Sequence, residues 1–585
     1  MDNIRKFLIE HISKTGGHLA SNLGVVELTQ ALHRIYDPYV DRIIWDVGHQ
    51  TYVHKMLTGR MDKFPTLRQF GGMSGFPKPA ESAADAFIAG HASNSVSVAL
   101  GMARARTLNK DSYEVVAVIG DGALTGGLAY EGLSNAGQSG EKITVILNDN
   151  GMSISKSVGS VAPMLKHLSE RPAYYNFKRA VKKFFGTVPG GSLIYKLIHN
   201  IKTKLKRLLL PSGANFFEDI GFRYFGPVDG HDIDRMTFFI SEAKKLNSPT
   251  LIHVLTKKGK GYPPAENFPN LYHGVHPFDP QVGVTEQNGE TFSGIFGKYL
   301  TEIGQKDEKV VAITAAMADG TGLFQFAEQF PNRFFDDGIT EAHSLTMAAG
   351  MAAQGLRPVF AVYSTFFQRA YDSLIHDTAI MSLPVVLAID RAGLVGEDGE
   401  THHGLYDLAL LMSVPNIEIF CPSNFTELKR CLTAALDQSD HPVAIRYPRG
   451  GELPHVELPA ISGEPSVTVV SYGIMTEAVG KAILLSGIFA EFFQLISVKV
   501  KCLQDLKNMA ESVSRTGKLA VIEDVAAYGC VGEHLIAELA KLNVFPKKVL
   551  LRNAGDGFVT HGSISDLRKL LRLDAESIAE DLQKL

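Results

Sequence analysis

Short apolar runs recur along the chain, separated by helix-length segments rich in alanine, leucine and glutamate such as 129–137 and 344–354. Continuous apolar runs of this length are typical of strands buried on both faces, as in parallel sheets covered by helices. Their alternation with helices predicts an α/β fold with mostly parallel sheets. The runs lie at residues 115–119, 143–147, 251–255, 310–314, 358–362, 384–389, 466–470, 495–500 and 519–523.

The 585 residues are more than a single hydrophobic core usually supports, so we expect three α/β domains. Turn-rich segments at 262–280 and 447–465 are typical of linkers. They place the expected domains at 1–285, 286–455 and 456–585.

Composition excludes several classes of protein. The net charge of -4 shows no basic excess of the kind that nucleic-acid binding requires. The 4 cysteines form no C-x-x-C pair, which argues against a zinc ribbon or a disulfide framework and favours a reducing compartment, with the cytoplasm as the expectation. The first residues lack a continuous apolar segment, and no stretch is apolar enough to span a bilayer, so we expect neither secretion nor membrane insertion.

Residues 166–210 are unusually rich in lysine and arginine. A solvated helical insertion in the first domain is the simplest interpretation. A mobile flap over an anionic ligand and a basic amphipathic contact with a membrane surface stay open as alternatives.

Asp121 lies between two glycines directly after the apolar run 115–119. An unpaired buried charge is costly, so we expect a positive group beside this carboxylate. A strand that ends in a glycine turn before a helix offers main-chain amides to an anion such as a phosphate. The dinucleotide-binding fingerprint does not fit, because Thr125 replaces its third glycine and Asp121 would face the pyrophosphate.

A Mg²⁺ ion between Asp121 and a diphosphate removes this conflict, since the ion prefers oxygen ligands. Residues 123–147 form a crossover to the next apolar run, so both strands should end at the same edge of a parallel sheet. There Asn150 offers an amide oxygen and Met152 a main-chain carbonyl. We therefore predict a metal site of Asp121, Asn150 and Met152, the alternative being a capped turn with Asp121 exposed.

This pairing of Gly-Asp-Gly with Asn-Asp-Asn resembles the site of the transketolase-type thiamine diphosphate enzymes, and most closely that of the 1-deoxy-D-xylulose-5-phosphate synthase family. The resemblance covers nearly the whole chain. Members of that family usually have further residues before the helix with which this chain starts, and 166–210 coincides with their variable insertion. The matching segments are 14–33, 45–60, 90–101, 256–266, 363–377, 390–404 and 446–450.

The resemblance implies a transketolase-like fold, a homodimer, and a transferase that uses thiamine diphosphate with Mg²⁺. It implies condensation of pyruvate with D-glyceraldehyde 3-phosphate to give CO₂ and 1-deoxy-D-xylulose 5-phosphate, a precursor of isoprenoids, thiamine and pyridoxal. Two alternatives stay open: ketol transfer as in transketolase, and a catalytically silent paralogue that only binds the cofactor.

The resemblance also implies catalytic roles. Glu341 would serve the pyrimidine N1′ of the cofactor, although a glutamate at a helix start could merely complement the helix dipole. His18, His49 and His402 would move protons at the reacting carbonyl, although each alone would be read as structural. The implied cofactor-binding residues are His49, Gly90, His91, Ala92, Gly122, Ala123, Asn150, Tyr262, Glu341 and Phe366, of which Phe366 alone would be read as core.

The resemblance implies that Arg369, Arg391 and Arg449 hold the acceptor's phosphate, which suits the bidentate geometry of arginine, although each alone would be read as a weak surface ion pair. Asp398 would orient the acceptor's hydroxyl groups. The implied substrate-binding residues are Tyr363, Arg369, Arg391, Asp398, Arg449 and His273.

Overall fold

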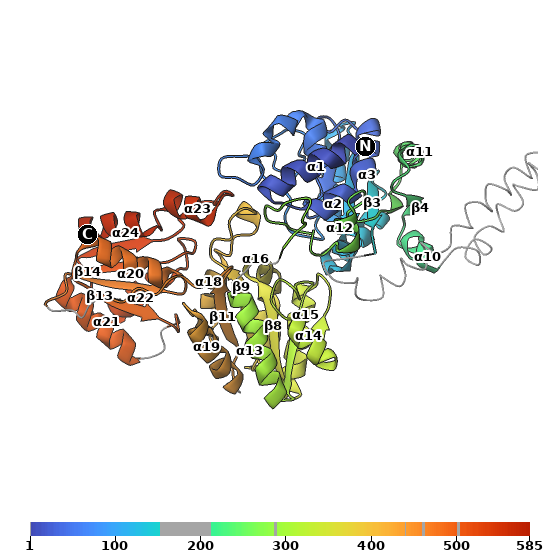
Figure 1. Ribbon diagram of the computed structural model, residues 1–585. Coiled ribbons are helices and arrows are strands. Elements are labelled where there is room, and N and C mark those ends of the chain that lie inside the picture. Colours follow the sequence, from blue (N-terminus) through green and yellow to red (C-terminus); the bar gives the residue numbers. More distant parts are fainter. Residues whose placement is uncertain (1, 152–211, 286–288, 439, 459–462, 500–502) are drawn as a thin grey trace, which may run out of the picture. The chain divides into compact units, whose positions relative to one another are not determined.

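The structure is a computed structural model that describes residues 2–151, 212–285, 289–438, 440–458, 463–499 and 503–585. The basic segment 166–210 and Met152 lie outside the described residues. The chain forms two compact units, which we call unit 1 (Met1–Leu67 and Gly75–Thr285) and unit 2 (Arg68–Ser74 and Glu286–Leu585). The predicted α/β class with mostly parallel sheets is confirmed: Figure 1 shows strands of parallel sheets between helices in each unit.

Unit 1 contains a 5-stranded parallel sheet in the order β1-β2-β3-β5-β4. Helices α3 and α11 cover one face, where Val116, Val118 and Ile252 form the core with Leu28 and Ile240. The strands are β1 (Arg42–Trp45), β2 (Val115–Gly120), β3 (Thr144–Asp149), β4 (Arg223–Asp229) and β5 (Thr250–Leu255). The helices are α1 (Asp2–Thr15), α2 (Leu19–Gly24), α3 (Val26–Ile35), α4 (Tyr52–Lys55), α5 (Ser95–Asn109), α6 (Gly127–Ser139), α10 (Ser212–Asp219), α11 (Ile233–Lys244) and α12 (Pro263–Asn267).

Unit 2 contains a 6-stranded parallel sheet in the order β10-β11-β9-β8-β6-β7 and a 4-stranded parallel sheet in the order β13-β12-β14-β15. The strands of the first are β6 (Val310–Thr314), β7 (Phe334–Asp336), β8 (Arg357–Tyr363), β9 (Val386–Ala392), β10 (Glu418–Phe420) and β11 (Val443–Pro448). Those of the second are β12 (Val467–Tyr472), β13 (Ala490–Leu495), β14 (Lys518–Ile522) and β15 (Lys548–Arg552).

Two large apolar clusters run through both sheets of unit 2, which explains why residues 286–585 pack as one unit. The predicted domain boundaries after residues 285 and 455 stay predictions. The longer helices are α13 (Phe292–Lys306), α14 (Phe324–Gln329), α15 (Glu341–Ala353), α18 (Asp407–Ser413), α19 (Phe425–Asp437), α20 (Met475–Ser486), α21 (Leu503–Thr516), α22 (Val531–Lys541), α23 (Ile564–Leu571) and α24 (Ala575–Lys584). Short helices are α16 (Ser364–Phe367) and α17 (Tyr371–Ser373).

Two local predictions were wrong. The strand expected at 495–500 lies instead at β13, because this edge strand is half exposed and its apolar character is weak. The segment 262–280 is not a linker but part of unit 1, where the amides and carbonyls of Gly17 and Val275 exchange hydrogen bonds of 2.8 and 2.9 Å and Tyr272 is buried.

Across the described parts of the chain, no helix combines the length and apolar character needed to cross a membrane.

Candidate active site

Asp121 directly follows β2, at the edge of the unit 1 sheet where the parallel strands end. Gly120 is paired with Asn148 of β3, and the Asp121 amide donates to the Asn148 carbonyl at 3.1 Å. The Asp121 side chain is buried, with 4% of the residue exposed, so an exposed turn is excluded. The two strand ends are therefore neighbours, as the crossover length predicts.

The polar residues after β3 have different partners. The Asn148 amide oxygen accepts from the Thr256 hydroxyl at 2.7 Å, and the Asp149 carboxylate lies 2.8 Å from Nε2 of His253. Both side chains therefore bond to groups in or just after β5. Asn150, one residue beyond β3, is half-buried. Asn150 lies at the same strand edge as Asp121, which fits its predicted role.

Lys258 supplies the positive charge that the burial of Asp121 requires. It is buried, and desolvation lowers the pKa of Lys258 to about 8, against the attraction of Asp121, which raises it. Sequence reasoning missed this residue, because a lysine in a run of lysines and glycines resembles a solvated loop.

Asp46, which follows β1, holds the loop that contains Gly90, His91 and Ala92. Its carboxylate accepts from the main-chain amides of Ser93 at 2.7 Å and Ser95 at 3.0 Å. Ser93 adopts a left-handed backbone with φ of 74°, a strained conformation for a residue with a side chain. Its hydroxyl donates to the Ala123 carbonyl at 2.7 Å. These contacts join loop 90–95 to the turn that contains Gly122 and Ala123, and Asp46 was not predicted.

Three predicted histidines of unit 1 form one cluster. The ring centroids of His18 and His49 are 5.5 Å apart, those of His49 and His273 5.2 Å, and those of His18 and His273 5.6 Å. The Asn22 amide nitrogen donates to the carbonyls of His18 and His49 at 2.6 and 2.8 Å. The structure therefore brings together residues from three separate motifs.

Tyr262 packs against a different part of unit 1. Its hydroxyl donates to the Pro280 carbonyl at 3.0 Å, and its ring lies edge-on to Tyr272 at 5.6 Å. Its phenol is thus engaged within the segment 262–280.

Glu341 is the first residue of α15 in unit 2. The side chain is buried, and desolvation raises the pKa of Glu341, against the opposing attraction of Arg369. A carboxyl group in this state keeps its proton at higher pH than an ordinary glutamate and is suited to proton exchange with a ligand.

Phe366 lies between two other predicted residues of unit 2. Its ring is stacked on Tyr363 at 5.9 Å and edge-on to His402 at 5.6 Å. Burial lowers the pKa of His402, so its imidazole is neutral at neutral pH, and its Nδ1 lies 2.8 Å from the Thr401 hydroxyl.

Arg391 holds Tyr363 in place. The guanidinium carbon lies 3.7 Å from the centre of the Tyr363 ring, and Nη1 donates to the Gly320 carbonyl at 2.8 Å. A Cβ atom at Gly320 would lie 1.6 Å from the Tyr363 hydroxyl, so only glycine fits there.

The remaining predicted groups of unit 2 have defined partners. Arg449 donates through Nη1 to the Val395 carbonyl at 3.1 Å and lies 3.4 Å from Glu397. Asp398 accepts from Nη2 of Arg68 at 2.7 Å. Arg68 was not predicted, because it lies 330 residues from Asp398 in the chain.

Family models match three successive parts of the chain. Residues 1–256 match 1-deoxy-D-xylulose-5-phosphate synthase, residues 290–451 the pyrimidine binding domain of transketolase, and residues 458–578 the transketolase C-terminal domain. The 1-deoxy-D-xylulose-5-phosphate synthase of Clostridium acetobutylicum is 47% identical, over 99% of this chain and 94% of its own length. The chain belongs to this synthase family.

A second synthase agrees with this assignment. The 1-deoxy-D-xylulose-5-phosphate synthase of Natranaerobius thermophilus is 53% identical over 77% of this chain and 71% of its own. Among solved structures, transketolase from Leishmania mexicana is 16% identical to this chain, with a TM-score of 0.43. The match covers 100% of this chain and 96% of the transketolase chain. The synthase family and its transketolase-type domains make the chain a transketolase-type transferase with a thiamine diphosphate cofactor.

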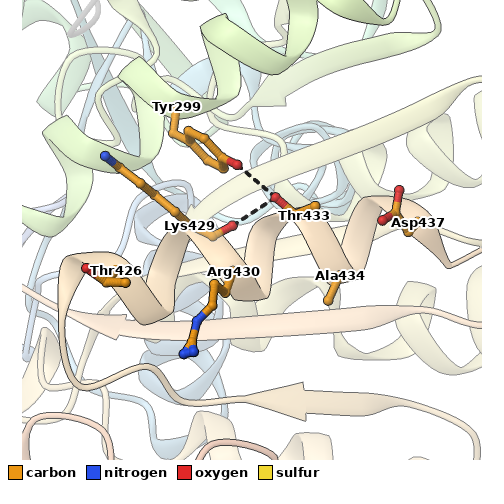
Figure 2. A pocket seen from close by; sticks show the side chains of 7 residues that line it. All are labelled: Tyr299, Thr426, Lys429, Arg430, Thr433, Ala434 and Asp437. Atoms are coloured by element: carbon orange, nitrogen blue, oxygen red, sulfur yellow. Dashed lines mark hydrogen bonds between the residues drawn. The ribbon is translucent and has the colours of Figure 1, made fainter.

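A surface pocket of about 430 Å³ in unit 2 contains none of the predicted site residues. Figure 2 shows it on the outer side of α19, with Tyr299 of α13 above it. The Thr433 hydroxyl there donates to the Lys429 carbonyl at 3.1 Å and lies 2.9 Å from the Tyr299 hydroxyl, so these polar groups satisfy one another. This pocket is therefore not the candidate active site, whose residues are those described above for unit 1 and for unit 2.

Proposed function

We propose that the protein condenses pyruvate with D-glyceraldehyde 3-phosphate, releasing CO₂ and forming 1-deoxy-D-xylulose 5-phosphate. The observation that carries this proposal is the buried Asp121 at the paired ends of β2 and β3, in a chain of this synthase family. A buried carboxylate beside main-chain amides fits a ligand that combines a cation with an anion.

The proposed Mg²⁺ ligands are Asp121, the Asn150 amide oxygen and the Met152 carbonyl. The proposed diphosphate-binding residues are Gly122 and Ala123 of the turn and Gly90, His91 and Ala92 of the loop, with Lys258 adding a charge. Oxygen donors suit Mg²⁺, and main-chain amides suit phosphate oxygens, so the residues fit this cofactor.

Bound thiamine diphosphate supplies the carbon nucleophile for the carbonyl of pyruvate. Glu341, with its raised pKa, would share a proton with N1′ of the pyrimidine, and Phe366 would pack against the pyrimidine ring. His18, His49 and His402 would donate and accept protons at the substrate oxygens, while His91, Tyr262 and His273 would line the cofactor and substrate sites.

Arg369, Arg391 and Arg449 would bind the phosphate of the acceptor, with the Tyr363 hydroxyl as a further donor. Asp398, held by Arg68, would accept from the acceptor's hydroxyl groups. We also propose a homodimer and a cytoplasmic location, on the resemblance and on the cysteine usage respectively.

Incubation of the protein with both substrates, Mg²⁺ and thiamine diphosphate tests the proposal. We expect CO₂ release and 1-deoxy-D-xylulose 5-phosphate by mass spectrometry, both stopping when a chelator is added. Ketol transfer from a ketose phosphate without CO₂ release would instead identify a transketolase. Cofactor binding without turnover of either kind would identify a silent paralogue.

A further inference from the structure

The loop 393–404 of unit 2 contains two of the predicted site residues, Asp398 and His402. It begins after β9 and is closed at its base, where the amides and carbonyls of Gly393 and Gly404 exchange two hydrogen bonds of 2.8 Å. The conformation of this closed loop decides where its polar groups lie.

His403, next to His402, makes two hydrogen bonds from inside this loop. Its Nδ1 accepts from the Val395 amide at 3.1 Å, and its Nε2 lies 3.0 Å from the Thr560 carbonyl. Because an amide only donates and a carbonyl only accepts, Nδ1 carries no proton and Nε2 carries one. The imidazole is neutral, and burial lowers the pKa of His403 in agreement with that state.

The loop also packs against the C-terminal part of unit 2. Leu394 and Leu405, at its two ends, form an apolar cluster with Val559 and Leu567. A Cβ atom at Gly399 would lie 2.9 Å from Cβ of His561, so loop and C-terminal segment are in close contact. The His403 bond to Thr560 adds a polar link to this apolar attachment.

Val395 connects His403 to Arg449. Its amide donates to His403, and its carbonyl accepts from Nη1 of Arg449 at 3.1 Å. The position of the Val395 backbone therefore sets one of the acceptors that fix the Arg449 guanidinium.

We propose that His403 is a positioning residue that fixes Val395 and, through it, Arg449 for the phosphate of the acceptor substrate. The proposal rests on the proposed function, in which Arg449 contacts that phosphate. His403 itself contacts no substrate.

Two variants separate the two hydrogen bonds of His403. In His403→Asn the amide oxygen takes the place of Nδ1 and keeps the bond to Val395, whereas in His403→Gln the amide nitrogen takes the place of Nε2 and keeps the bond to Thr560. We expect His403→Gln to raise the KM for D-glyceraldehyde 3-phosphate about tenfold with an unchanged KM for pyruvate, and His403→Asn to keep both near the wild-type values.

An equilibrium measurement makes the test independent of turnover. The dissociation constant of D-glyceraldehyde 3-phosphate is measured by calorimetry for each variant, with and without Arg449→Met. We expect His403→Gln to weaken binding about tenfold in the Arg449 protein and to have no further effect in the Arg449→Met protein, as a double-mutant cycle requires for coupled residues.

Thermal denaturation shows whether each variant folds. Equal rises of both KM values, or weakening by His403→Gln that persists with Arg449→Met, would overturn the inference. Wild-type protein that binds the aldehyde phosphate but forms no product would refute the proposed function alone, and the binding cycle would still decide the role of His403. Wild-type protein that does not bind it would overturn both.

Discussion

In unit 1 the candidate residues lie among main-chain amides and carboxylates, whereas in unit 2 they lie among guanidinium groups. Asp46 accepts two amides of loop 90–95, and Asp121 lies near Lys258. Arg391 and Arg449 instead donate to main-chain carbonyls beside Tyr363 and loop 393–404. This difference indicates that unit 1 is suited to a diphosphate that binds together with a cation, and that unit 2 is suited to a phosphate that binds directly to arginine.

The largest effect is expected in unit 2. Glu341→Gln should lower kcat for CO₂ release from pyruvate by about 10²–10⁴-fold, the usual contribution of a proton-transfer group, because an amide cannot exchange the proton. The measurement is CO₂ release, with substitution of the exposed α14 residue, Glu328→Gln, as the control. Release at the wild-type rate would show that Glu341 only complements the dipole of α15.

The matching test in unit 1 removes the proposed metal ligand Asp121. Asp121→Asn should weaken Mg²⁺ binding in the presence of thiamine diphosphate by about 100-fold, because a neutral amide replaces a charged ligand. Calorimetric titration with Mg²⁺ measures the change, and Asp111→Asn at an exposed position of unit 1 is the control. Unaltered affinity would exclude Asp121 as a ligand and remove the contrast between the units.

The third test asks whether loop 90–95 depends on a carboxylate. Asp41 and Asp46 flank β1, and each buried carboxylate accepts two main-chain amides, those of Asp37 and Glu114 in the case of Asp41. Both Asp→Asn variants should lose about 1–3 kcal/mol of unfolding free energy, but only Asp46→Asn should also weaken cofactor binding, by about tenfold.

The fluorescence of Trp45, the 1 tryptophan of the chain, reports urea unfolding for both variants. Cofactor binding is measured by calorimetry. Equal cofactor affinities in the two variants would show that Asp46 contributes to stability and not to cofactor binding.

The smallest expected effect is on the pH dependence of unit 1 stability. His33 lies 2.9 Å from His54, and burial lowers the pKa of His33 from 6.5 to about 3. The unfolded chain therefore takes up a proton below pH 6.5 that the folded chain refuses until about pH 3, so stability falls across this window as pH decreases.

His33 alone should make the unfolding free energy about 1.4 kcal/mol lower at pH 5.5 than at pH 7.5. His33→Gln should remove that share of the decrease, as measured by urea unfolding followed through Trp45. An identical pH dependence of the unfolding free energy in wild type and variant would show that the pKa of His33 does not differ between the folded and the unfolded protein.

Strands buried on both faces were predictable from the sequence. The continuous apolar runs at β2, β3 and β6 coincide with strands, because both faces of those strands are covered. Sequence reasoning missed the 3-residue strands β7 and β10 and the alternating strand β4, since short or half-exposed strands bury too few apolar residues to form a run.

The candidate site was predictable where neighbouring strand ends carry it. Asp121 and Asn150 come from adjacent strands, so chain topology alone places them together. Asp46, Arg68 and His403 depend instead on tertiary contacts with distant residues or on main-chain atoms, neither of which leaves a pattern in the local sequence.

The close fit of Gly320 against the Tyr363 hydroxyl constrains redesign of the proposed acceptor site. Any larger residue at position 320 would have to displace the tyrosine, whose ring face lies against the guanidinium of Arg391. Directed evolution of altered acceptor range should therefore change positions 320 and 363 in the same clone, and libraries that vary either site alone should be depleted of active members.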